Sequence, residues 1–287
     1  RVRSSAASDV YKRQVQTYAV KNLKKGIEFL EQQFGVKWDW DAFWKNAEMY
    51  NDTSRCMVEK WDVNCTEHPQ VCGAALALQR EYEFMAAACM DKFMHKTDLR
   101  VTKMMLKGYE QDKATNAPPP KYRCLVWACP AHYYTNFTYW TQHCWGVTCV
   151  NDMEAMLSYL PITIGDKEQA LADLVRCYEK MMMRSHTNGG YVNLLDECWK
   201  MCEKFHTNIV IMYDHVSCKN VGGLHGLFED QARERGIHLI WIPHDVMDPR
   251  TVSRREMREA FSQYMVTVLN EKPLDPTLLD YEDALSW

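Results

Sequence analysis

The chain has no hydrophobic run long enough to cross a membrane. Its longest apolar stretches, NIVIMYD and IHLIWIP, are far shorter than the roughly 20 residues that a spanning helix needs. Basic residues are not in excess, because the formal net charge is −4. A stripe of aromatic and arginine residues, typical of proteins that bind single-stranded nucleic acid, is also missing. These absences argue against membrane and nucleic-acid partners, and we expect a cytoplasmic protein.

The signatures of several enzyme classes are missing as well. The sequence contains no G-x-x-x-x-G-K-[ST], no G-x-G-x-x-G after a strand, no H-E-x-x-H and no G-x-S-x-G. The first of these would mark a phosphate-binding loop, and the others would mark dinucleotide, zinc-protease and serine-hydrolase sites. We therefore do not expect this chain to hydrolyse ATP by itself.

Sulfur, in contrast, is abundant, with 12 cysteines and 17 methionines among 287 residues. An even number of cysteines, together with the triplets NDT, NCT and NFT, is compatible with a secreted, disulfide-bonded protein. Disulfide frameworks, however, dominate small chains without a core, and this chain has long amphipathic helices and buried strands. We therefore expect a reducing cytosol, in which most of the thiols are small buried hydrophobic groups.

The first residues are not expected to belong to the fold. Residues 4–14, SSAASDVYKRQ, are identical to the translation of a common transposase-based sequencing adapter. We therefore expect residues 1–14 to be adapter-derived rather than native, and we exclude them from the fold prediction. The true N-terminus would then be missing.

Residues 15–117 are predicted to form a helical region. Apolar residues recur at three- and four-residue spacing in three stretches, 18–35, 39–61 and 74–94. Asp39 or Asp41 is suited to cap the second helix, and Gly35 is suited to end the first. The segment QDKATNAPPPKYR, residues 111–123, is polar and then proline-rich, which predicts the boundary of this region.

Residues 118–287 are predicted to form an α/β domain. Four short stretches are continuously apolar and alternate with helical patterns: 123–129, 146–152, 207–214 and 237–245. Continuous apolar character is typical of strands buried on both faces. We therefore expect a doubly wound, mostly parallel sheet of four strands. Ligands bind beyond the carboxyl ends of such strands, which selects Cys129, Pro130, Asn151, Asp152, the loop 214–223, His244 and Asp245.

The loop DHVSCKNVGGLHG, residues 214–226, is the most informative segment. It places Cys218 on a glycine-rich turn before a helix, where backbone N–H groups favour a thiolate. The thiolate could ligate a metal or act as a nucleophile with His215 or His244, the second of which Asp245 could orient. A bystander cysteine is the third interpretation. Cys198 and Cys202 lie four apart on one helical face and are expected to pack against the sheet.

Three segments of the C-terminal half carry a resemblance to a known family: SCKNVGG, GIHLIWIPHDVMDPR and REMREAFSQYM. They resemble the late cysteine loop, the strand that ends in aspartate and the closing helix of the benzoyl-CoA reductase and 2-hydroxyacyl-CoA (2-hydroxyglutaryl-CoA) dehydratase family of strict anaerobes. The stretch 123–152 is similar to the family's strand, proline turn, helix and second strand. His238 stands where the family usually has proline, and LHG stands where the reductase branch has a G-Q pair.

This resemblance implies a [4Fe–4S] cluster on three cysteines, two from a preceding α/β domain and one from the late loop. Only the late one, Cys218, has a match in this chain. The resemblance therefore places the other two ligands, and a first α/β domain, upstream of Val15. Ser217, Lys219 and Asp245 are possible site-lining residues, and no catalytic residue is assigned.

The resemblance also implies partners and a reaction. The partners are a homologous second subunit and a separate ATP-hydrolysing iron–sulfur activator. The expected reaction is the radical dehydration of a 2-hydroxyacyl-CoA to an enoyl-CoA through a ketyl, and this fragment alone would be inactive. One alternative is a benzoyl-CoA reductase-type subunit that reduces an aromatic acyl-CoA. The other is a cluster-bearing scaffold or electron-relay subunit.

Overall fold

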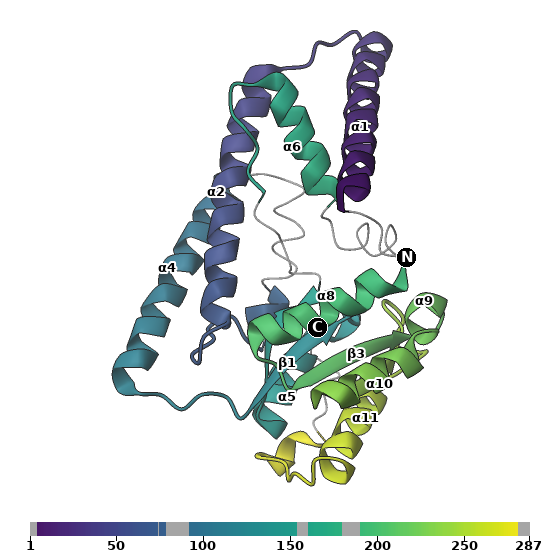
Figure 1. Ribbon diagram of the computed structural model, residues 1–287. Coiled ribbons are helices and arrows are strands. Elements are labelled where there is room, and N and C mark those ends of the chain that lie inside the picture. The colour runs from purple at the N-terminus through teal and green to yellow at the C-terminus, as the bar shows by residue number, and fades with distance from the viewer. Residues whose placement is uncertain (1–4, 74, 79–91, 154–159, 180–189, 281–287) are drawn as a thin grey trace.

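A computed structural model describes residues 5–73, 75–78, 92–153, 160–179 and 190–280 (Figure 1). These residues form a parallel sheet with helices on both faces, and long helices stand above the sheet in the figure. None of the described helices combines the length and the hydropathy that a membrane span requires.

The first two predicted helices are confirmed. α1 (Ser5–Phe34) starts within the adapter-like segment and ends where Gly35 adopts φ +64°, a left-handed conformation that glycine reaches without steric cost. α2 (Trp40–Asn64) has Asp39, not Asp41, as its N-cap, because the Asp39 carboxylate accepts a hydrogen bond from the Ala42 N–H at 2.9 Å. This bond satisfies one of the N–H groups that the first turn leaves unpaired.

The third predicted helix, 74–94, lies mostly outside the described residues. The next described helix, α4 (Lys92–Thr115), extends into the segment 111–123 that the sequence marks as a boundary. Its polar residues Gln111–Thr115 are compatible with a helix, and the helix ends only where Asn116 adopts φ +53° and three prolines follow.

α6 (Lys167–Glu179) follows the second strand in sequence, yet it packs against α1 and α2 (Figure 1). The Gln16 side chain on α1 donates a hydrogen bond to Glu179 at 3.0 Å. Asn51 on α2 exchanges two hydrogen bonds of 2.8 Å with the backbone of Ile162, in the loop before α6. A segment from the C-terminal half therefore completes the packing of the N-terminal helices.

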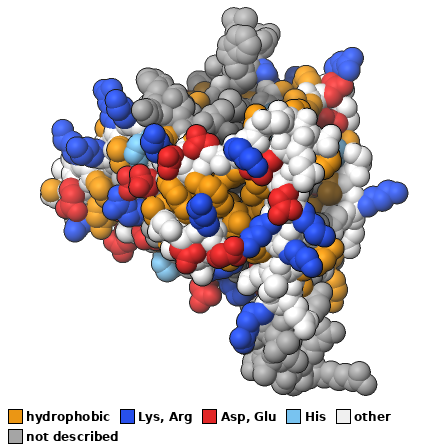
Figure 2. Space-filling view, turned by 90° about the horizontal axis from the view of Figure 1, so that it is seen from above, with side chains coloured by type: hydrophobic (Ala, Val, Ile, Leu, Met, Phe, Trp, Pro, Cys, Tyr) orange, Lys and Arg blue, Asp and Glu red, His pale blue; other side chains and the backbone are white. Residues whose placement is uncertain are grey.

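Hydrophobic side chains also reach the surface where these helices meet. Seen from above, they gather in the middle of the face with charged side chains around them (Figure 2). The exposed ones at the end of α1, in the turn to α2 and in the loop before α6 are Phe34, Val36, Trp38 and Ile164. Trp38 also contacts the rings of Trp40 and Phe43 at 6.2 and 6.1 Å, so aromatic packing fixes the turn between the two helices.

The sheet confirms the predicted fold class. Its strands are all parallel, in the order β2-β1-β3-β4, and they span Tyr122–Trp127 (β1), Val147–Asp152 (β2), Ile209–His215 (β3) and His238–His244 (β4). Each strand lies within two residues of the predicted bounds. β1 and β2 are almost wholly buried, as expected for strands covered on both faces.

Helices cover the two faces in pairs, which makes the domain doubly wound. α5 (Phe137–Trp145) and α11 (Arg254–Thr267) pack on one face, where the rings of Phe137 and Phe261 lie 5.9 Å apart. α8 (Tyr191–Phe205) and α10 (His225–Arg235) pack on the other. Three short helical turns complete the described elements: η1 (His132–Tyr134), α9 (Lys219–Gly222) and η3 (Pro276–Leu278).

The end of α2 is hydrogen-bonded to a β-bulge in the sheet. β1 and β2 fall out of register after Cys124, which leaves Val150 as an extra residue in β2. The buried Asn64 donates hydrogen bonds to the carbonyls of Val150 (2.7 Å) and Val71 (2.8 Å). Its own carbonyl accepts from the N–H groups of Gln70 and Val71, both at 3.0 Å. One amide thus satisfies the carbonyl of a β-bulge and closes the loop after α2.

Candidate functional site

The strand order places the topological switch point between β1 and β3. The chain leaves β1 toward β2 on one side, and β3 and β4 lie on the other side. The loops that follow β1 and β3 therefore diverge at their carboxyl ends, and this is where open parallel sheets bind ligands. Cys129 lies in the first loop and Cys218 in the second.

The loop after β1 begins with backbone strain. Ala128 adopts φ +67°, a left-handed conformation that costs an L-residue about 1–2 kcal/mol and that is common at functional sites. Cys129 follows, with its Sγ 3.8 Å from Nε2 of His132. The His132 N–H donates to the Val246 carbonyl at 2.9 Å, so this loop is tied to the loop after β4. The sequence analysis selected Cys129 but missed His132.

Three of the predicted site residues, Ser217, Cys218 and Asp245, lie close to His215 at the end of β3. His215 accepts hydrogen bonds at Nδ1 from the N–H (3.2 Å) and the hydroxyl (3.0 Å) of Ser217. Its Nε2 lies 3.9 Å from Oδ2 of Asp245, which comes from the loop after β4. The Cys218 N–H donates to the His215 carbonyl at 2.9 Å. Because Nδ1 faces an N–H, the ring proton of neutral His215 belongs on Nε2, toward the carboxylate.

Asp245 also shapes the turn after β4. Its Oδ1 accepts hydrogen bonds from the N–H groups of Asp248 (2.8 Å) and Met247 (2.9 Å). Both bonds lower the pKa of the Asp245 carboxyl, and the bond from Asp248 has the larger effect. Lys219, like Ser217, is exposed, and it forms no ion pair in the described part of the chain.

Cys218 occupies the N-cap position of α9 and is half-buried. Its Sγ makes no hydrogen bond within the described residues, and neither the His215 ring nor the His244 ring lies within hydrogen-bonding distance of it. The His244 ring instead contacts the rings of Tyr213 (4.9 Å) and His215 (5.4 Å). The geometry therefore does not favour the interpretation of Cys218 as a nucleophile paired with either histidine.

His244 is fully buried, and burial lowers its pKa from the ordinary 6.5 to about 4. The unfolded chain therefore binds a proton more tightly than the folded chain does. The free energy of unfolding therefore does not depend on His244 protonation above pH 6.5. It decreases as the pH falls from 6.5 toward 4, by about 3 kcal/mol in total. We expect His244→Leu to flatten the pH dependence of the urea midpoint between pH 7 and pH 4. An equally steep decline in both proteins would contradict this assignment.

The described residues do not complete a ligand set for a metal cluster. No three His, Cys, Asp or Glu side chains among them lie close enough to hold a metal ion. None of the eleven described cysteines forms a disulfide. Cys198 and Cys202 are buried between α8 and the sheet, as expected for packing residues, and burial raises the pKa of the Cys198 thiol well above its ordinary value. The described residues around Cys218 therefore do not complete a metal site by themselves.

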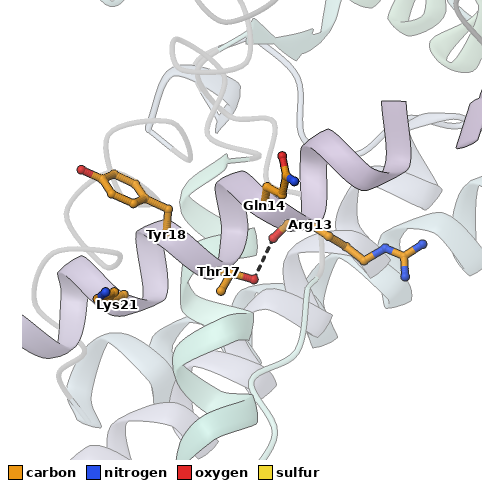
Figure 3. A pocket seen from close by; sticks show the side chains of 5 residues that line it. All are labelled: Arg13, Gln14, Thr17, Tyr18 and Lys21. Carbon is orange, nitrogen blue, oxygen red and sulfur yellow. Dashed lines mark hydrogen bonds between the residues drawn. The ribbon is translucent and has the colours of Figure 1, made fainter. Parts of the chain in front are cut away.

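A shallow cavity of about 470 Å³ lies along α1, far in sequence from the sheet loops. The side chains that line it come from successive turns of one helix and do not converge on a point (Figure 3). Arg13 and Gln14 among them belong to the adapter-like segment. Binding sites need convergent polar groups, so the switch point is the better candidate.

The fold and the site define a doubly wound α/β protein with a cysteine loop at the switch point of its sheet. The chain belongs to the family described as 2-hydroxyglutaryl-CoA dehydratase, D-component, whose model matches residues 8–265. The match starts within the adapter-like segment and ends in α11. It confirms the resemblance to this family, and the matched range includes the cysteine loop, the last strand and most of the closing helix. No curated protein matches the chain.

Proposed function

We propose that this chain is a subunit of a 2-hydroxyacyl-CoA dehydratase, a lyase that removes water from a 2-hydroxyacyl-CoA to form an enoyl-CoA. The observation that carries the proposal is the family match over residues 8–265. The position of the Cys218 loop supports it, because the switch point of a parallel sheet is the place where such a domain binds ligands.

The proposed cofactor is a [4Fe–4S] cluster to which Cys218 contributes one thiolate. The half-buried sulfur of Cys218 is free of hydrogen bonds within the described residues, and the Cys218 N–H bond to His215 holds the start of the loop in place. The other two thiolates would come from outside the described residues. A bound cluster would supply single electrons at a potential set by its ligands, burial and hydrogen bonds.

The proposed complex contains a homologous second subunit and a separate activator that hydrolyses ATP and delivers electrons for a radical dehydration. The sequence supports a separate activator, since it contains no phosphate-binding loop of its own. Ser217 and Asp245 are proposed to line the site, because His215 lies between them at the carboxyl end of β3. Lys219 is proposed as a third lining residue, at the start of α9.

A direct test is turnover of the full-length chain, reconstituted with its partner subunit and activator, on two substrates. With a 2-hydroxyacyl-CoA we expect enoyl-CoA, followed by its ultraviolet absorbance and by mass spectrometry. With an aromatic acyl-CoA we expect no ring reduction. Ring reduction without dehydration would refute the dehydratase proposal in favour of a benzoyl-CoA reductase-type subunit.

A further inference from the structure

A second histidine–carboxylate pair lies on the other face of β3. Asp214, the last-but-one residue of β3, approaches His225, the first residue of α10, with 3.3 Å between Oδ2 and Nε2. His225 follows Cys218 by seven residues in the same connection. The pair therefore lies at the carboxyl edge of the sheet, the same edge as the switch point, although the sequence analysis did not select it.

The His225 ring is held from a second direction by an indole. It stacks on Trp241 of β4, with ring centroids 3.5 Å apart and an angle of 21° between the planes. Trp241 is fixed in turn, because its Nε1–H donates to Glu229 of α10 at 2.5 Å. Asp214 of β3 therefore faces the ring directly, whereas Glu229 of α10 holds the indole on which the ring stacks.

These constraints distinguish the two ring nitrogens of His225. Nε2 is buried and faces the Asp214 carboxylate, without the alignment of a full hydrogen bond. Nδ1 is the remaining nitrogen of a side chain that is 40% exposed, and within the described residues it has no partner. A neutral ring with its proton on Nε2, toward the carboxylate, leaves the Nδ1 lone pair available to a ligand.

We propose that His225 accepts a proton from carbon in the dehydration, which rests on the proposed function. In the one-electron-reduced acyl chain of the proposed radical dehydration, the C2–O bond breaks and hydroxide leaves. The C3–H bond of the resulting radical then breaks, its electron pair contributes to the C2–C3 double bond, and the electron that the activator supplied is given back. His225 Nδ1 takes the proton and passes it to the hydroxide, so that the products are enoyl-CoA and water. Asp214 stabilises the transient imidazolium, as a carboxylate does in other catalytic histidine pairs.

Stability alone does not account for the pair. The Asp214 side chain is 34% exposed, and even a fully charged pair with this exposure contributes only about 0–1 kcal/mol. His143 on α5 provides a matched control. It also stacks on an aromatic ring, that of Tyr139 at 3.9 Å, but its Nδ1 lies 2.9 Å from a backbone carbonyl, and no carboxylate pairs with it in the described part of the chain.

The experiment uses the full-length complex with its partner and activator. For His225→Gln we expect dehydration to slow by about a hundredfold or more, the usual range for loss of a general base, and exchange of the C3 proton with D2O to slow equally. Reduction of the complex by the activator, followed by its visible spectrum, should stay unchanged. His143→Gln should match the parent in all three measurements.

Two outcomes overturn the proposal: dehydration by His225→Gln at the parental rate, or slow dehydration with parental C3 exchange. Failure of the parent complex to dehydrate any 2-hydroxyacyl-CoA would refute the proposed function instead. In that case the nitrogen assignment is tested separately by ¹⁵N NMR of the chain. The proton is expected on Nε2 of His225, and a proton on Nδ1 would overturn the base assignment.

Discussion

Replacing Asn64 with alanine is expected to lower the free energy of unfolding by about 3 kcal/mol or more, since each buried group left unpaired costs about 1–3 kcal/mol. The substitution leaves the Val150 and Val71 carbonyls and the Gln70 and Val71 N–H groups without these hydrogen bonds. Asn64 is fully buried, so water cannot replace these bonds without opening the structure. Urea denaturation followed by circular dichroism measures the change.

Asn220 provides the control for this substitution. It is an exposed asparagine on α9, and no hydrogen bond of its side chain is present in the described part of the chain. Asn220→Ala should change the free energy of unfolding by less than about 0.5 kcal/mol, as surface substitutions usually do. If Asn64→Ala were no more destabilising than Asn220→Ala, the Asn64 side chain would not be the group that stabilises the contact between α2 and the sheet.

Replacing Cys218 with serine is expected to remove cluster iron from the purified complex and to lower turnover by about a hundredfold or more, since loss of a mere supporting contact to a metal ligand already costs 10–100-fold. A serine hydroxyl is not ionised at neutral pH and is a harder ligand than a thiolate, which iron–sulfur clusters require. The measurements are iron and sulfide content, and enoyl-CoA formation.

Cys65→Ser is the matched control, because Cys65 is also a half-buried thiol outside any disulfide, but it lies at the C-cap of α2 rather than in the loop after β3. It should keep parental iron and turnover. Unchanged iron and turnover in Cys218→Ser would exclude ligation. Loss of iron without loss of turnover would favour a scaffold or electron-relay role.

Much of the fold could be predicted because burial on both faces leaves a clear pattern. Continuous apolar stretches marked all four strands, and the segment REMREAFSQYM lies within α11, whose capping box joins Ser253 and Glu256 by hydrogen bonds. The C-terminal end of α4 was harder to predict from the sequence. Polar residues such as Gln111 and Asp112 suit both helices and linkers, so only Asn116 and the prolines set the end.

The site was harder to predict because it depends on which loops meet. The rule for carboxyl strand ends selected Cys129, the loop 214–223, His244 and Asp245, and the structure places them at one edge of the sheet. It could not identify His215 as the residue between Ser217 and Asp245. The pairing of Asp214 with His225 also required the relative placement of β3, β4 and α10, which no local pattern encodes.

The placement of α6 has a consequence for synthesis of the protein on the ribosome. α6 begins at Lys167, after two strands of the sheet, yet it supplies contacts to α1 and α2. During translation these early helices cannot bury that face until α6 has left the exit tunnel. The nascent chain therefore carries an incompletely covered helix pair while the first half of the sheet is being made, which is the stage at which a chaperone would be most useful.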